Sequence, residues 1–322
     1  MSVKRFPYGG QAVLEGVMMR GLRQATVAVR SPSGEIVFKH EQLDVQRRRR
    51  WEETPFLRGV LMLWDALSLG VRALNFSASV ATGEDEPAPS HGALTLTLVV
   101  SLAFAFGLFF ALPLLLASLL TRFGVSTLVR DAAEGVIQLA IFIGYLGLIS
   151  RVPDIQRVFG YHGAEHKAIN AYEAGAPLTV PSVQSFTVIH PRCGTSFLLV
   201  VVVLSIPVFA LFGGLPLWAR LASRVVLVPM IAAVSYELLR LSAANYHRGW
   251  VRALVAPSLA LQRLTTREPD DSMVAVAIAA LLPVLAADGV RAPAFDEALG
   301  AGVGQAALPG EPAVEPAASP AG

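Results

Sequence analysis

The chain has 322 residues, of which 54% are hydrophobic and 16% are charged, and its formal net charge is +2. A soluble domain typically carries about 25% charged residues, so the composition excludes an ordinary soluble protein and indicates a membrane protein. The small net charge gives no support to a nucleic-acid partner.

Two features of the chain bear on its compartment. It contains one cysteine, Cys193, and therefore no internal disulfide, which fits a protein that faces the reducing cytoplasm. Residues 1–20 lack the apolar core and the small-residue cleavage site of a signal peptide. We therefore expect the internal apolar helices to drive insertion into the membrane.

Residues 1–54 are polar and predict a cytoplasmic N-terminal region that contains a small β-hairpin. Residues 26–30 and 35–39 have the composition of strands, and the turn between them contains proline and glycine. Before this hairpin, residues 9–21 include four glycines. That density of glycine favours a loop with unusual backbone dihedrals.

Residues 55–90 predict an amphipathic helix and a linker. Apolar side chains recur at helical spacing through residues 55–80, but charged side chains interrupt any span: Arg58, Asp65 and Arg72. We expect this helix to lie on the membrane surface or to pack under the other helices. The four arginines of residues 47–50, just before it, are either a solvated charge run or an anchor to anionic lipid headgroups.

Four apolar segments within residues 93–240 are predicted to cross the membrane, since about 20 residues span a bilayer. They are residues 93–120, 132–150, 195–213 and 217–240. Positive charges gather before the first segment, between the second and third, and after the fourth. The positive-inside rule therefore places both termini and the loop 151–194 in the cytoplasm. The sequence thus predicts an α-helical polytopic protein of the bacterial inner membrane, in contact with lipids and with other membrane proteins or a second copy of itself.

The C-terminal part predicts one more helix and a tail. Residues 241–287 are expected to form a cytoplasmic helical segment, in which residues 273–287 are too short for a comfortable span. Asp271 or Ser272 is a suitable N-cap, so we expect a helix that packs on the rest of the protein, with a re-entrant helix as the alternative. Residues 304–322 are rich in alanine, proline and glycine and are predicted to be disordered.

The side chains that can carry chemistry gather in the loop between the second and third predicted spans. His162 and His166 are four residues apart, so a helix places both imidazoles on one face. Together with Glu165 they form the H-x-x-E-H pattern of inverted zincins. In such a site two imidazoles bind zinc, a third ligand completes the set, and a glutamate acts as general base. The motif therefore predicts zinc ligands at His162 and His166 and a catalytic base at Glu165.

The third ligand is not part of the motif. Glu173 lies on nearly the same helical face, but about 10 Å along the axis from His166, which is too far to share one ion. His190 or Cys193 is the better candidate, because a loop can fold back and either atom type suits zinc. Two alternatives stay open: the histidines form hydrogen bonds on a helix near the headgroups, or Cys193 is a nucleophile with His190 as its base.

Three further carboxylates are candidates for a functional role. Glu15 lies among the N-terminal glycines, and Glu237 lies near the cytoplasmic end of the fourth predicted span. Either residue could belong to a site, or Glu15 could form a turn and Glu237 could pair with Arg240. Glu134, at the end of the second span, could equally be an exposed terminal charge.

Several ordered blocks of the sequence resemble the YqhQ family, also called domain of unknown function 1385. The blocks are residues 9–21, 161–167, 190–197, 235–237 and 265–271, and the resemblance runs from about residue 7 to 287. It implies a bacterial membrane protein that depends on a metal, and it specifies neither a reaction nor a substrate.

The resemblance also singles out particular positions of this chain. The family-motif positions are His162, Glu165, His166, His190, Cys193, Glu15 and Glu237. One departure is visible in the last helix, where many relatives have a glutamate and this chain has Ala275. A carboxylate at that position is therefore not expected to be essential in this protein.

Two hypotheses of different classes follow. The first is a zinc-dependent hydrolase of the membrane, with its H-x-x-E-H site at the cytoplasmic face. The second is a non-catalytic membrane scaffold or assembly factor, in which the polar motifs tie the loops into a cytoplasmic docking platform. A transporter is disfavoured, because the predicted spans contain few central charges and no paired broken helices.

Overall fold

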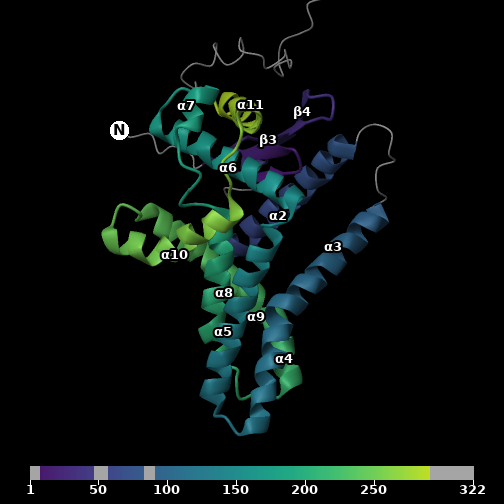
Figure 1. Cartoon of the computed structure of the whole chain (residues 1–322), viewed down its shortest axis with the longest axis vertical. Coiled ribbons are helices and arrows are strands. Elements are labelled where there is room, and N and C mark those ends of the chain that lie inside the picture. Colours follow the sequence, from purple (N-terminus) through teal and green to yellow (C-terminus); the bar gives the residue numbers. More distant parts are fainter. Residues whose placement is uncertain (1–7, 47–56, 83–90, 291–322) are drawn as a thin grey trace, which may run out of the picture.

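The computed structural model describes residues 8–46, 57–82 and 91–290. A head with a β-sheet covered by helices lies at one end, and a bundle of long apolar helices extends away from it (Figure 1). The run of four arginines at 47–50, with both of its interpretations, and the predicted disordered tail at 304–322 lie outside the described residues.

The sheet of the head has four antiparallel strands in the order β1-β2-β3-β4. The predicted hairpin is confirmed as β3 (Gln24–Arg30) and β4 (Ile36–Gln42). The predicted glycine-rich loop is wrong, because the same residues form a second hairpin of β1 (Gly9–Val13) and β2 (Gly16–Arg20). A Cβ on Gly16 would lie 2.2 Å from the carbonyl oxygen of Ala28, so glycine here lets neighbouring strands approach.

Helices cover both faces of this sheet, which explains why its inner strands read as almost continuous apolar runs. Side chains of a strand alternate between the faces. Val17, Met19 and Ala28 pack with α6 (Pro153–Ala174) and α11 (Asp271–Ala287). Met18, Val27 and Val29 pack on the other face against Leu69 and Ala73 of α2 (Leu57–Thr82).

Helix α11 is the C-terminal helix that the sequence predicts, and it is almost wholly buried in the head. A helix that is apolar on all sides belongs in a core, and here α6, α7 (Val180–Gln184) and the sheet surround it. The predicted N-cap is wrong by one residue. Asp270 caps the helix, since its Oδ1 accepts a hydrogen bond of 2.9 Å from the backbone N–H of Met273.

The first predicted span is one continuous helical segment with an irregular centre. It consists of α3 (His91–Phe106), the π-helical turn η1 (Gly107–Ala111), α4 (Leu112–Ser118) and the 3₁₀ turn η2 (Leu119–Phe123). Pro113 lacks an N–H and its ring crowds the carbonyl of the preceding turn. The wider π-helical turn before it absorbs this mismatch.

The other predicted spans correspond to α5 (Thr127–Ile149), α8 (Gly194–Ala210) and α9 (Leu217–Ala244), which lie side by side with α4 (Figure 1). Among the described residues, four helical segments are long and apolar enough to cross a membrane: Arg58–Ala81, Thr95–Phe123, Thr127–Ile149 and Leu217–Ala244. The total of four agrees with the prediction, but the membership differs. The predicted span α8 is shorter than these four segments, and α2, which was predicted to lie on the membrane surface or under the other helices, supplies the fourth segment instead. Part of the apolar surface of α2 packs against the sheet, and Leu69 and Ala73 are buried in this contact.

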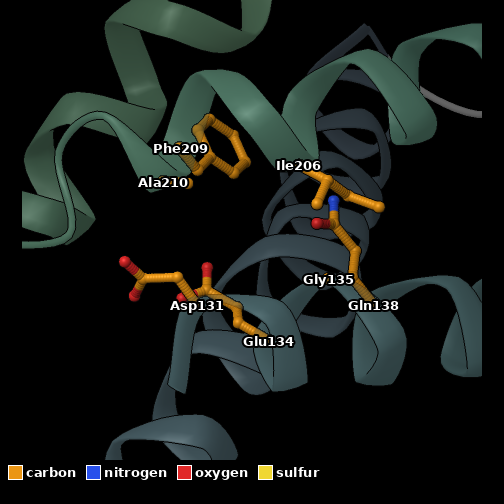
Figure 2. A pocket seen from close by; sticks show the side chains of 7 residues that line it. All are labelled: Asp131, Glu134, Gly135, Gln138, Ile206, Phe209 and Ala210. Atoms are coloured by element: carbon orange, nitrogen blue, oxygen red, sulfur yellow. The ribbon is translucent and has the colours of Figure 1, made fainter. Parts of the chain in front are cut away.

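Charged side chains are buried between α5 and α9 at the end of the bundle that is far from the head. Glu134 is 4% exposed and accepts hydrogen bonds from Arg220 and Arg224, so the reading of Glu134 as an exposed terminal charge is wrong. Asp131 contacts Arg220 at 3.2 Å. Figure 2 shows Glu134 and Gln138 along α5, facing Ile206 and Phe209 of α8.

An ion pair joins the first hairpin to α6 and gives the head a dependence on pH. Glu15 sits in the β1–β2 turn with a φ of 51°, and its two oxygens accept hydrogen bonds of 2.6 and 2.5 Å from Arg157. These bonds hold the pKa of Glu15 below its ordinary value of 4.5, against the opposing effect of burial. A depressed carboxyl pKa contributes stability at neutral pH that is lost as the pH falls through the folded-state value.

We therefore expect Glu15→Gln to lower the stability of the protein at neutral pH and to make its acid unfolding below pH 4.5 less steep. Thermal unfolding of the full chain between pH 3 and 7 measures both effects. Glu35→Gln, on the exposed β3–β4 turn, is the matched control. Equal pH profiles for the Glu15 and Glu35 variants would contradict this assignment.

Candidate metal centre

The two motif histidines lie on α6, whose ends are defined by local sequence. Pro153 occupies the first turn, and Gly175 ends the helix in the left-handed conformation with a φ of 72°. The helical period places His162 and His166 one turn apart on the same face, and their ring centroids are 4.4 Å apart. The two imidazoles therefore approach each other, as the sequence predicts.

Cys193 is the side chain that joins them. It is the N-cap of α8, and its Sγ lies 3.2 Å from Nε2 of His162. Among the described residues, one ligand atom each from His162, His166 and Cys193 lies within 4.8 Å of the other two. His166 is 1% and Cys193 is 4% exposed, whereas His162 is half-buried. The cluster is thus mostly enclosed, and His162 is its most exposed member.

Backbone carbonyls determine which ring nitrogens face the cluster. Nδ1 of His162 lies 2.7 Å from the carbonyl oxygen of Thr265, and Nδ1 of His166 lies 2.5 Å from that of Val188. A carbonyl oxygen only accepts, so in both bonds Nδ1 carries the proton and donates. Each neutral imidazole then has its lone pair on Nε2. Metal-binding histidines are commonly held in this way, by a hydrogen bond from the second ring nitrogen.

His190, the other candidate third ligand, is beside the cluster but is directed elsewhere. Its ring centroid is 5.6 Å from that of His166, and its Nε2 is 3.6 Å from the carboxylate of Glu173. Its backbone N–H donates to Oε1 of Gln262, and its carbonyl accepts from Nε2 of the same side chain. His190 is not in the three-ligand group, and the sulfur of Cys193 has His162 rather than His190 as its imidazole partner.

The predicted base, Glu165, is buried on the side of α6 that faces the sheet. It is 6% exposed, and its Cγ would be 3.0 Å from a Cβ on Gly10 of β1. Its carboxylate is not part of the three-ligand group. Its role as general base stays a prediction.

The two remaining candidate carboxylates hold elements of the fold together. Glu15 binds Arg157 of α6, as described above, and Tyr161 donates a hydrogen bond of 3.3 Å to it. The two carboxylate oxygens of Glu237 in α9 accept hydrogen bonds of 2.5 and 2.6 Å from the guanidinium group of Arg58 in α2. The sequence had suggested Arg240 as the partner of Glu237. Neither carboxylate belongs to the cluster.

The end of α10 (Gly249–Thr265) and the segment that follows it supply contacts that the motif does not reveal. Thr265 orients His162 through its carbonyl, and Gln262 clamps the backbone of His190. A backbone carbonyl carries no sequence signal, because every residue has one. The only hint was that residues 265–271 form one of the blocks of the family resemblance.

Gly163 lets this segment approach α6, and we expect its substitution to weaken the site. A Cβ at Gly163 would lie 2.0 Å from the carbonyl oxygen of Arg267, whose N–H binds the carbonyl of Phe159. Gly163→Ala should push the segment outward, loosen the bond between Thr265 and His162, and reduce metal affinity by about 10–100-fold. Zinc titration measures this, with Gly144→Ala, where a Cβ meets no atom within 4 Å, as control. Unchanged affinity would show that the segment does not orient His162.

The fold and the cluster together define a class of protein: a helical protein with apolar helices long enough to span a membrane, a sheet-containing head, and a largely enclosed His–His–Cys cluster between them. The chain belongs to the family described as protein of unknown function (DUF1385), whose model matches residues 54–287. It is 38% identical over 296 residues to the uncharacterized protein YqhQ of Bacillus subtilis (strain 168), which covers 86% of this chain and 92% of that protein. The resemblance to the YqhQ family is thereby confirmed. No solved structure matches the chain.

Proposed function

We propose that this protein is a membrane-embedded, zinc-dependent hydrolase whose metal ligands are His162, His166 and Cys193. The observation that carries the proposal is that one ligand atom each of His162, His166 and Cys193 lies within 4.8 Å of the other two, while Nδ1 of both imidazoles is held by a backbone carbonyl and Nε2 is left to bind a metal. Tetrahedral zinc with ordinary bond lengths separates a nitrogen and a sulfur ligand by about 3.5 Å. The separation of 3.2 Å between His162 and Cys193 is close to that value.

The chemistry of the ligand set supports zinc in a catalytic rather than a structural site. Three protein ligands leave one position for a water, whereas structural zinc sites usually have four. Zinc bound there would lower the pKa of that water and polarise a carbonyl group. The chain itself supplies the hydroxyl groups of Thr195, 3.1 Å from the sulfur, and of Thr265, 3.4 Å from Thr195. These hydroxyls can orient a water or a polar substrate group.

The distribution of positive charge supports a cytoplasmic head. Exposed arginines lie at the head end of the bundle: Arg151, Arg240, Arg248, Arg252 and Arg263. At the other end, Arg122 is exposed and Arg130 is half-buried and pairs with Asp131, whereas Arg220 and Arg224 are 3% and 0% exposed and pair with buried acids. Excess positive charge marks the cytoplasmic side of a membrane protein, so we place the head and the metal centre there.

The direct test is the metal content of the purified full-length protein. One zinc per chain, removed by a chelator and restored by added zinc, is the expected result. Metal that is absent after purification and that does not bind on titration at micromolar zinc would overturn the proposal.

A non-catalytic assembly factor is the second candidate, and one observation favours it. Two of the family-motif carboxylates, Glu15 and Glu237, take part in ion pairs that tie the head and the helices together. In that case crosslinking in cells should recover a specific protein partner, and chelation should leave the complex intact. A complex that dissociates on chelation would contradict this candidate.

A further inference from the structure

An apolar groove opens on the side of the bundle beside the metal cluster. It has a volume of about 370 Å³, and aliphatic side chains of three helices form most of its wall. The residues that contribute are Leu199, Val200, Val203, Leu204 and Pro207 of α8, Leu238, Leu239 and Ser242 of α9, and Leu254, Val255, Pro257, Ser258 and Leu259 of α10. The wall contains no charged and no aromatic side chain, so its chemistry matches a saturated hydrocarbon.

One end of the groove reaches the loop that carries Cys193. Pro191 and Ser196, on either side of Cys193 in the chain, both line the groove. The backbone N–H of Ser196 binds the carbonyl of Cys193 at 3.2 Å, and the hydroxyl of Ser196 accepts a hydrogen bond from Gln262, which also holds His190. The groove and the cluster therefore adjoin each other at the N-terminus of α8.

The other side of the groove opens toward the surface that lipid would cover. Val203 is 50% and Leu254 is 68% exposed, and both line the groove. The helix α10 extends sideways from the junction of head and bundle (Figure 1). Its first turns expose Trp250, together with Arg252 and the preceding Arg248. Tryptophan favours the membrane–water interface and arginine attracts anionic headgroups, so these side chains set the headgroup level close to the groove.

We infer that the groove holds an acyl chain of an anionic phospholipid and that the ester bond of that lipid is the substrate of the metal centre. The inference rests on the proposed hydrolase. The chain lies among the aliphatic side chains, the headgroup lies by the arginines of α10, and the ester reaches the cluster past Ser196. In the reaction, the oxygen of water bonds to the acyl carbon and the ester C–O bond breaks. One proton goes to the leaving glycerol oxygen and the other is released with the fatty acid.

The groove acts by position more than by affinity. The bilayer interior is as apolar as the groove, so a lipid gains little hydrophobic free energy by entering it. What the groove supplies is a fixed distance between a chain and the cluster, which lowers the entropic barrier of the reaction. The informative readout is therefore the place where a lipid binds rather than the strength of binding.

The test uses the full-length protein in nanodiscs of phosphatidylethanolamine and phosphatidylglycerol, with a diazirine on the sn-2 chain of some of the phosphatidylglycerol. Light-induced crosslinks mapped by mass spectrometry are expected to concentrate on the α8, α9 and α10 segments of the groove. Val200→Trp, which fills the groove, should abolish these crosslinks and leave the metal content unchanged. Leu148→Trp, at a side chain of α5 that is 64% exposed and outside the groove, should change neither.

Release of fatty acid provides the second readout, with the ether-linked analogue as the uncleavable control. His162→Ala should lose release and retain the groove crosslinks. Crosslinks spread evenly over the apolar surface, or unaffected by Val200→Trp, would overturn the lipid groove while a bound metal would still support the proposed function. Groove crosslinks on a protein that binds no metal would support the lipid groove and would overturn the proposed function. Bound metal and groove crosslinks without release of fatty acid would overturn the ester as substrate.

Discussion

Replacement of His162, His166 or Cys193 by alanine is expected to abolish zinc binding by the purified protein. Each of the three offers one atom to a group whose members lie within 4.8 Å of one another. Even the outer partners of metal ligands typically cost about 10–100-fold in affinity when they are mutated, so loss of a ligand should cost more. Elemental analysis and titration of the metal-free protein with zinc measure the effect.

Two other histidines make this experiment specific. His247 is exposed and outside the cluster, so His247→Ala should bind zinc like the unmodified protein. His190 is buried next to His166, but its Nε2 faces Glu173, and His190→Ala should retain most of the metal. If His190→Ala empties the site and Cys193→Ala does not, the choice of the third ligand is wrong. Circular dichroism of each variant establishes that it is folded.

Glu134→Gln is expected to cause the largest loss of stability among single substitutions in the bundle. The carboxylate of Glu134 binds two buried guanidinium groups, and Arg224 is completely buried. Removing one partner of a buried ion pair typically costs about 3–5 kcal/mol, because the remaining charge is left without compensation. Unfolding of the purified protein by heat or denaturant should show this loss, although Glu134 is far from the metal centre.

Two further variants distinguish the stability cost of leaving a buried charge unpaired from the cost of losing any ion pair. Glu237→Gln removes a pair with Arg58 whose side chains are 22% and 24% exposed, and it should cost about 1 kcal/mol or less. The double variant Glu134→Leu and Arg224→Leu removes both charges and leaves Arg220 with Asp131, so it should recover much of the loss. A double variant as unstable as Glu134→Gln would show that packing, rather than charge, is responsible.

Much of the helical architecture was predictable because it depends on local patterns. Three of the four predicted spans coincide with long apolar helices, since length and hydropathy are local properties. The short α8 was also placed correctly as a helix. The glycine-rich β1–β2 hairpin was missed, because glycine normally weakens a strand, and its advantage here is the close approach of Gly16 to β3.

Part of the proposed metal centre was predictable for the same reason. The i, i+4 spacing of His162 and His166 places both rings on one face of any helix that contains them. The choice between His190 and Cys193 was not predictable, because it depends on where the chain returns to α6 after α7. The sequence also offered no sign of the carbonyl groups of Thr265 and Val188, which orient the two rings.

The sequence by itself determined the apolar helices and the pairing of two imidazoles on one helical face, because both follow from the period and length of a single segment. Only the tertiary structure decided that Cys193 meets His162, that Glu134 lies buried between two arginines, and that Glu15 and Glu237 form ion pairs. Each of these contacts joins residues far apart in the chain. Its geometry is set by the packing of whole elements, and no local pattern encodes that packing.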